Sequence, residues 1–203
     1  MKNLVIYIHG KGGSATEAAH YVSLFPESDV VGFDYKAQTP WDARAEFSSF
    51  FDLQSRKYTS VTLIANSIGA FFALSSLADK KIDRAFLISP VVDMDRLICD
   101  MLLWANVSEK ELEQRREIAT DFGETLSWEY LCSVRSNPIR WNIPTCVLYG
   151  ENDTLVPYET VCRFVGETGA SLTVMPSGEH WFHTDEQMSF LDRWITASRR
   201  KET

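Results

Sequence analysis

The feature of this sequence that most constrains its fold is a series of short apolar runs rich in β-branched and aromatic residues. Each run is nearly continuous rather than alternating, which is typical of strands covered on both faces, and most intervening segments have helical length and spacing. The runs are residues 4–8, 30–33, 61–65, 85–89, 145–149 and 172–175, and the helical segments are 14–25, 40–57, 68–80 and 157–167. This order predicts an α/β protein with about six mostly parallel strands and helices on both faces of the sheet.

The interval between Ser89 and Thr145 departs from this alternation, because it is much longer than the other connections. Ser108 is followed three residues later by Glu111, which resembles a helix capping box, so we expect helices here rather than a long loop. We interpret residues 93–140 as a helical insertion. The 203 residues, 45% of them hydrophobic, are enough for one sizeable core, so we expect a single domain over 1–203.

Composition narrows the classes of partner. The chain has 28 acidic and 20 basic residues, and the net charge of -8 argues against nucleic acid and favours small neutral or cationic substrates. No apolar stretch approaches the roughly 20 residues of a membrane span, and the apolar part of the N-terminal segment is too short for a signal peptide. We therefore expect a cytoplasmic protein with no membrane partner. Four cysteines without paired spacing predict reduced thiols with no function: Cys99, Cys132, Cys146 and Cys162.

One serine, Ser67, stands where an apolar run gives way to a helix-like run. In a parallel sheet this position lies at the carboxyl edge, where α/β proteins bind ligands. A sharp strand-to-helix turn strains its central residue and needs small residues two positions away, where Ala65 and Gly69 stand. Such a turn exposes the hydroxyl and directs the Ile68 N–H toward an oxyanion formed there. The stretch resembles the nucleophile elbow of the α/β-hydrolase family.

The resemblance extends to the two partners that a serine nucleophile needs, a base and an acid that orients the base. Asp153 follows the run at 145–149, and His180 follows the run at 172–175. The order Ser, Asp, His is that of the family, which implies that Asp153 is the acid and His180 the base. Glu151 is a competing acid two residues away, and we favour Asp153 because of its position in the family pattern.

A fourth element is "YIHGKGGS" at residues 7–14. In α/β-hydrolases a His-Gly pair after the first core strand leads into a second oxyanion donor, which implies the backbone N–H of Lys11 in this chain. Two departures from the family pattern are modest. Ala65 replaces the first glycine of G-x-S-x-G, and the first strand occupies the place of the family's third. The resemblance covers nearly the whole chain and implies a three-layer α/β-hydrolase fold with a lid at about 93–140.

This resemblance implies a serine hydrolase that cleaves small carboxylic esters through an acyl-enzyme intermediate, without a cofactor and with a small acyl compound as its partner. Thioesters and small amides pass through the same intermediate, and a non-catalytic binding protein of this fold is a further alternative. The charged stretch "SEKELEQRRE" argues against a lipase lid. The residues expected to line the substrate pocket are His9, Trp104, Trp128, Tyr130 and Trp181. Of these, Trp104, Trp128 and Tyr130 could instead hold the insertion onto the body of the protein.

Two other interpretations compete for parts of the same sequence. Gly10, Gly12 and Ala15 fit G-x-G-x-x-A after a strand, and Asp34 ends the next strand, as in dinucleotide-binding proteins. We disfavour this interpretation because it leaves the serine, the aspartate and the histidine unexplained. The segment "EHWFHTDE" contains four potential metal ligands, Glu179, His180, His183 and Asp185, but their spacing matches no known ligand set, so we expect no metal.

Overall fold

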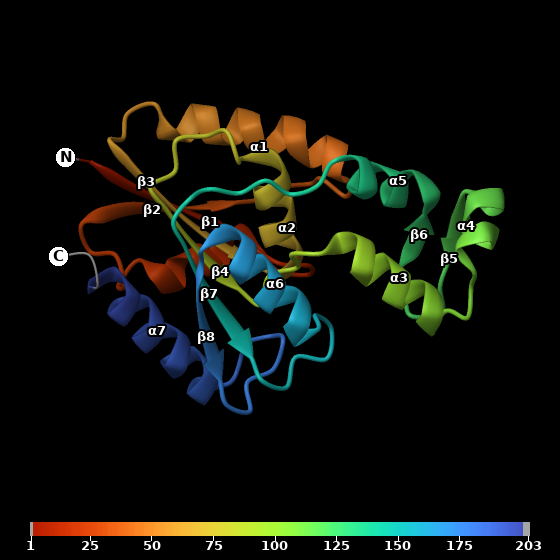
Figure 1. The fold of residues 1–203 in the computed structure, drawn as a ribbon. Helices are drawn as coiled ribbons and strands as arrows, with labels where there is room; N and C mark the ends of the chain where they lie inside the picture. Colours follow the sequence, from red (N-terminus) through yellow and green to blue (C-terminus); the bar gives the residue numbers. More distant parts are fainter. Residues whose placement is uncertain (1, 201–203) are drawn as a thin grey trace.

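The computed structural model of the protein describes residues 2–200. Six strands form one sheet in the order β2-β1-β3-β4-β7-β8, and every pairing in it is parallel. The strands are β1 (Asn3–Ile8), β2 (Ser28–Phe33), β3 (Ser60–Asn66), β4 (Arg84–Ile88), β7 (Thr145–Gly150) and β8 (Ser171–Met175). The predicted six-stranded, mostly parallel α/β architecture is confirmed (Figure 1).

Helices cover both faces of the sheet. The 3-10 helix η1 (Ala15–Tyr21) and helix α7 (Asp185–Arg200) pack on one face, and α1 (Pro40–Ser55), α2 (Ser67–Ser76) and α6 (Tyr158–Thr168) pack on the other (Figure 1). Successive side chains of a strand point to opposite faces, so a strand between two helical layers must be apolar at every position. In β1, Val5 and Tyr7 join the core under η1 and α7, whereas Leu4 and Ile6 join the core on the other face.

The segment between β4 and β7 contains three helices, α3 (Met94–Trp104), α4 (Glu109–Arg115) and α5 (Trp128–Ser136). It also contains an antiparallel hairpin, β5 (Glu117–Ala119) and β6 (Thr125–Ser127), which we did not predict. Helix α4 ends at Arg115, because Arg116 adopts a φ of 68°. Figure 1 shows α4 and the hairpin projecting from one side of the sheet.

Buried apolar residues and one arginine hold this segment together. Leu112, Ile118, Leu126 and Leu131 are buried and belong to the same core as α1 and α2. The Arg135 guanidinium of α5 bonds to carboxylates on two other helices. Its Nε donates to Asp95 of α3 at 3.0 Å, and its Nη1 donates to Glu109 of α4 at 2.6 Å. The arginine therefore ties the three helices of the segment to one another.

Two further observations concern the residues between 2 and 200. The four cysteines are unpaired and half-buried. No helix in this part of the chain is both long and apolar enough to cross a membrane.

Candidate active site

Ser67 is the first residue of α2 and directly follows β3, with a φ of 48°. That left-handed conformation is unfavourable for a residue with a Cβ, so the surrounding structure must hold it in place. The turn also requires close approach of the backbone. A Cβ on Gly69 would lie 2.2 Å from the carbonyl oxygen of His9, and one on Gly10 would lie 3.2 Å from the Cβ of Ser67. Ala65, where the family pattern has glycine, is fully buried.

The structure brings Ser67, His180 and Asp153 together. Ser67 Oγ lies 2.8 Å from His180 Nε2, and His180 Nδ1 lies 2.7 Å from Asp153 Oδ2. The Asp153 side chain is completely buried, whereas that of His180 is 20% exposed. An ionised carboxylate only accepts hydrogen bonds, so we assign the imidazole proton to Nδ1, and Nε2 then accepts the bond that the serine hydroxyl donates.

The choice between the two acids follows from the hydrogen bonds. Asp153 Oδ1 accepts bonds from the backbone N–H groups of Leu155 and Val156, both at 2.9 Å, which leaves Oδ2 to face the histidine. Glu151 is exposed, and its Oε2 accepts a bond from the Ser177 N–H at 2.8 Å. Asp153 is therefore the acid that contacts the histidine, and Glu151 instead links two loops.

Two glycines that we did not single out from the sequence hold the loops of the acid and the histidine together. A Cβ on Gly150 would lie 2.4 Å from the Glu179 carbonyl oxygen, and one on Gly178 would lie 3.1 Å from the Gly150 Cα. The Asn152 N–H also donates to the Gly178 carbonyl at 2.7 Å. The sequence pattern that could have identified them is a glycine at or just after the end of each of two successive strands, Gly150 in β7 and Gly178 after β8.

The two expected oxyanion donors lie at the start of α2 and in the turn after β1. Ile68 is the second residue of α2, so its N–H is one of those that a helix leaves without an intrahelical acceptor. The turn is closed by a bond from the Gly13 N–H to the Gly10 carbonyl at 3.2 Å, and Lys11 in this turn lines the same cavity as the serine. The Lys11 ammonium forms an ion pair with Glu124, at the start of β6.

The cavity beside Ser67 has a volume of about 720 Å³. Of the residues expected to line a substrate pocket, Trp181 lines it, with 71% of its surface exposed. His9 is buried and stacks on Tyr35, with ring centroids 4.4 Å apart.

The other three aromatic residues expected in the pocket belong to the chain between β4 and β7, which we call the projecting segment. Two of them pack against the main core. Trp104 is half exposed and makes an edge contact with Phe122. Trp128 and Tyr130 are partly buried against the main core, where Tyr130 stacks on Phe71 of α2 at 6.4 Å. Burial raises the pKa of Tyr130 well above its usual range. The contacts of Trp128 and Tyr130 match the alternative that they hold the insertion onto the body.

Among the residues of the cavity wall that were absent from our predictions, Tyr7, Glu17 and Asn66 form one hydrogen-bonded chain. The Tyr7 hydroxyl donates to the Glu17 carboxylate, and Asn66 Nδ2 donates to the Tyr7 oxygen at 2.9 Å. Burial, the neighbouring Tyr21 and the bond to Glu17 raise the pKa of Tyr7 far above its ordinary value, so this hydroxyl stays protonated. The pattern Ser14-x-x-Glu17, a capping box, was a signal for Glu17 in the sequence.

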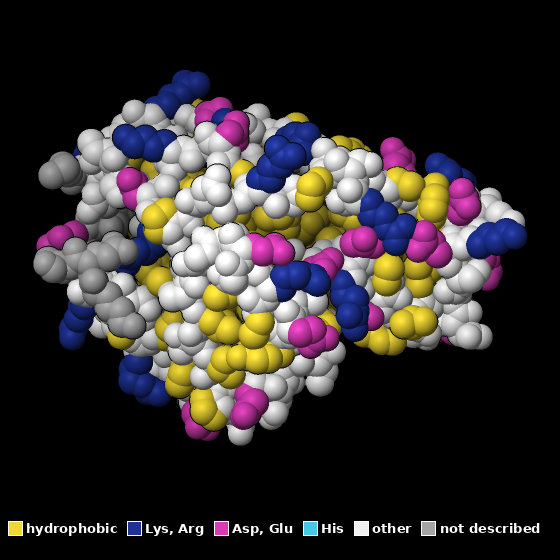
Figure 2. All heavy atoms as spheres, in the orientation of Figure 1, with side chains coloured by type: hydrophobic (Ala, Val, Ile, Leu, Met, Phe, Trp, Pro, Cys, Tyr) yellow, Lys and Arg dark blue, Asp and Glu magenta, His cyan; other side chains and the backbone are white. Residues whose placement is uncertain are grey.

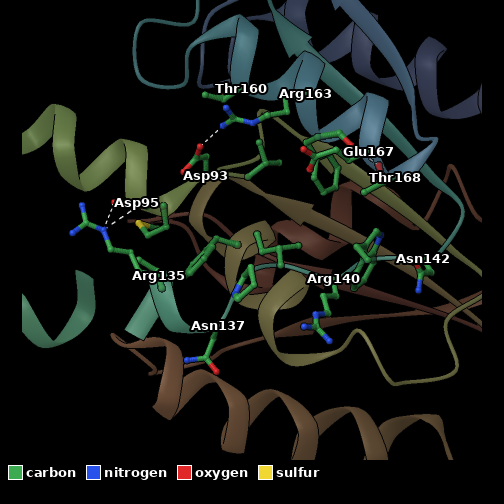
Figure 3. Close-up of a pocket in the computed structure, with 18 residues that line it drawn as sticks. Asp93, Asp95, Arg135, Asn137, Arg140, Asn142, Thr160, Arg163, Glu167 and Thr168 are labelled. Atoms are coloured by element: carbon green, nitrogen blue, oxygen red, sulfur yellow. Dashed lines mark hydrogen bonds and ion pairs between the residues drawn. The ribbon is translucent and has the colours of Figure 1, made fainter. Parts of the chain in front are cut away.

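A second cavity, of about 570 Å³, lies between the α3–α5 segment and α6 (Figure 3). Asp93 and Arg163 form an ion pair in its wall, and Arg135 bonds to Asp95 at one side. Within the described part of the chain, no histidine, cysteine or serine lines it. This cavity therefore lacks a nucleophile with a base, and the one beside Ser67 is the candidate active site.

The competing interpretations find little support in the local structure. The helix after the glycine turn is a 3-10 helix with the acidic Glu17 in its first turn, which opposes pyrophosphate binding there. Asp34 bonds to Lys36 at 2.8 Å. Among residues 2–200, no three His, Cys, Asp or Glu side chains lie close enough together to hold a metal ion.

Comparisons with known proteins give a consistent result at the level of the fold. No protein-family model matches the chain, and no curated protein matches it significantly. Among solved structures, Est1E from Butyrivibrio proteoclasticus is similar with a TM-score of 0.78 at 18% identity, over 97% of this chain and 86% of that one. Alpha/beta hydrolase domain-containing protein 10 from mouse has a TM-score of 0.76 at 16% identity, over 98% and 90%.

A third similar structure is XC6422 from Xanthomonas campestris, described as an α/β serine hydrolase without a lid. Its TM-score is 0.64 at 16% identity, over 98% of this chain and 81% of that one. At these identities a likeness in structure concerns the fold. The sheet order, the strand-to-helix turn at Ser67 and these neighbours agree, and the chain has the α/β-hydrolase fold.

Proposed function

We propose that this protein is a serine hydrolase that cleaves small carboxylic esters through an acyl-enzyme intermediate. The observation that carries the proposal is the pair of short hydrogen bonds that link Ser67 to the buried Asp153 through His180. A serine hydroxyl becomes a nucleophile when a base accepts its proton, and a buried carboxylate fixes the tautomer of that base. The strained conformation of Ser67 and its place beside a cavity agree with this role.

The chemistry follows from the geometry. Ser67 Oγ attacks the acyl carbon while His180 Nε2 takes the hydroxyl proton, and the imidazolium then gives this proton to the leaving alkoxide. Asp153 stabilises the imidazolium. The N–H groups of Lys11 and Ile68 donate to the oxyanion, each contributing on the order of 3 kcal/mol to the transition state. Water then cleaves the acyl-enzyme by the same sequence of proton transfers.

Two of the similar structures support an ester as the substrate. Est1E has been solved with ferulic acid bound, and another neighbour is named an esterase from Pyrococcus furiosus. We propose that the projecting segment limits substrate size as a lid, because Glu124 of this segment pairs with Lys11 in the cavity wall. Side chains of both charges are interspersed with exposed apolar ones over the segment (Figure 2), which differs from the continuous apolar face of a lipase lid.

The proposal is tested by the intact mass of the protein after brief exposure to a fluorophosphonate. We expect one adduct on the wild type and none on Ser67→Ala, with the fold of the variant confirmed by circular dichroism. Short-chain esters, thioesters and amides then rank the acyl compounds by kcat/KM. Absence of an adduct on folded wild-type protein, together with ligand binding without turnover, would instead identify a non-catalytic binding protein.

A further inference from the structure

The walls of the cavity beside Ser67 carry an uneven distribution of charge. Besides His180, three basic side chains line this cavity, and each of them lies beside a carboxylate. The pairs are Lys11 with Glu124, His20 with Asp192 at 2.7 Å, and His183 with Glu179 at 3.8 Å. The Lys11 ammonium is therefore compensated by Glu124, and each of the two histidine rings has a carboxylate beside it, so these side chains offer little attraction to an anionic substrate.

Glu17 is the acidic residue of the cavity wall, and its partners are neutral. One carboxylate oxygen accepts a hydrogen bond from the Tyr7 hydroxyl, and the other accepts one from the Ser14 N–H at 2.9 Å. Within residues 2–200, no lysine, arginine or histidine lies within ion-pair distance of it. The wall of the cavity therefore carries one negative charge that the protein does not neutralise.

The Glu17 carboxylate is held in a defined position. The capping box fixes it to the start of η1, and Gly13 leaves room for it, since a Cβ there would lie 2.7 Å from Glu17 Oε1. A carboxylate has about four acceptor positions, and the two hydrogen bonds above use only part of them. The group is thus pre-organised and retains capacity to bind a ligand.

The same hydrogen bonds connect Glu17 to the nucleophile. Tyr7 has one hydroxyl proton and donates it in the hydrogen bond to Glu17, so its oxygen must accept the bond from Asn66 Nδ2. Asn66 directly precedes Ser67. Glu17 and Ser67 therefore lie in one cavity wall, two hydrogen bonds apart through Tyr7 and Asn66. Because both residues line one cavity, a ligand that fills this cavity can contact both.

We propose that Glu17 selects esters that carry an ammonium group, an inference that rests on the proposed hydrolase function. The aromatic residues Tyr21 and Trp181 line the same cavity, and aromatic rings attract a cationic nitrogen that displaces water. The net charge of -8 draws such substrates toward the protein from solution. Glu17 acts here as a specificity-determining residue that binds the part of the substrate away from the scissile bond.

The test uses pairs of esters that differ in charge and little in shape. Acetylcholine is paired with neohexyl acetate, which has carbon in place of the quaternary nitrogen. Ethyl γ-aminobutyrate is paired with ethyl valerate. For at least one pair, we expect the ratio of kcat/KM for the cationic over the neutral ester to fall about tenfold in Glu17→Gln. Glutamine keeps the size of the side chain and removes the charge. Its amide nitrogen only donates, so the variant also loses one of the two bonds accepted from Tyr7 and Ser14, and its fold is checked by circular dichroism.

Glu113→Gln is the matched control. Glu113 is exposed on α4, away from the cavity, so this substitution removes the same charge at a distant site. An equal fall of the ratio in both variants, or an unchanged ratio in Glu17→Gln for both pairs, would overturn the proposal. Calorimetry measures the affinity of acetylcholine for Ser67→Ala and for Ser67→Ala/Glu17→Gln, which gives a readout without turnover. Weaker binding to the double variant supports the ammonium site even if Ser67 forms no fluorophosphonate adduct, and equal binding excludes it.

Discussion

At the scale of single residues, the identity of the acid rests on which carboxylate contacts His180. Asp153→Asn should lower kcat on a short-chain ester by about 10⁴-fold, because an amide in this place favours the wrong imidazole tautomer. Glu151→Gln should retain activity within a few-fold, since Glu151 bonds to the Ser177 N–H and not to the histidine. Steady-state kinetics of both variants measure this difference. A larger loss for the Glu151 variant would show that the acid is misassigned.

The strand-to-helix turn makes a second prediction at this scale. Gly69→Ala should destabilise the protein by about 1–3 kcal/mol, because the new Cβ would lie 2.2 Å from a backbone oxygen of His9 and must displace the turn. Gly166→Ala in α6 is the control, since nothing lies within 4 Å of its Cβ position, and it should stabilise the helix by about 0.5–1 kcal/mol. Urea unfolding of both variants measures the two changes, and equal effects would contradict the steric argument.

At the scale of elements, the projecting segment depends on Arg135. The Arg135→Leu variant leaves Asp95 and Glu109 without their cation, and their exposure limits the loss of stability to about 1 kcal/mol. The expected effect is local, with faster hydrogen exchange over residues 109–127 and little change in the sheet. Arg115→Leu is the control, because among residues 2–200 Arg115 pairs only with Glu111 of its own helix. The same acceleration in both variants would show that Arg135 does not join the helices.

At the scale of the whole molecule, buried tyrosines couple the fold to alkaline pH. Desolvation is the largest cause of raised pKa values at Tyr7, Tyr21, Tyr35, Tyr130 and Tyr149, and it raises the pKa of Tyr35 and of Tyr149 to about 12. A raised folded-state pKa contributes stability that is present below the unfolded value of about 10 and is lost as pH rises toward the folded value.

We therefore expect cooperative unfolding between about pH 10 and pH 12, with tyrosinate absorbance appearing together with the loss of circular dichroism. Parallel titrations by the two signals, from neutral pH upward, measure this. Tyrosinate that forms gradually near pH 10 in a protein with intact secondary structure would contradict the prediction.

The sequence alone determined the architecture and the order of the main site residues. Apolar runs such as residues 4–8 and 61–65 indicate strands covered on both faces, since each is nearly continuously apolar, and Ser67 shortly after the second run marks the strand-to-helix turn. The hairpin at residues 117–127 escaped prediction because its strands are three residues long and carry too little periodicity.

Only the tertiary structure decided which side chains meet. Asp153 and Glu151 are equivalent as residue types, and the backbone N–H groups of Leu155 and Val156 orient Asp153 toward His180. In the same way, Glu17 comes from a capping box that is local in sequence, yet it lines the Ser67 cavity because η1 packs against β1 and β2. The spacing of apolar residues along the sequence indicates which face of an element is buried, whereas contacts between distant segments depend on how the elements pack.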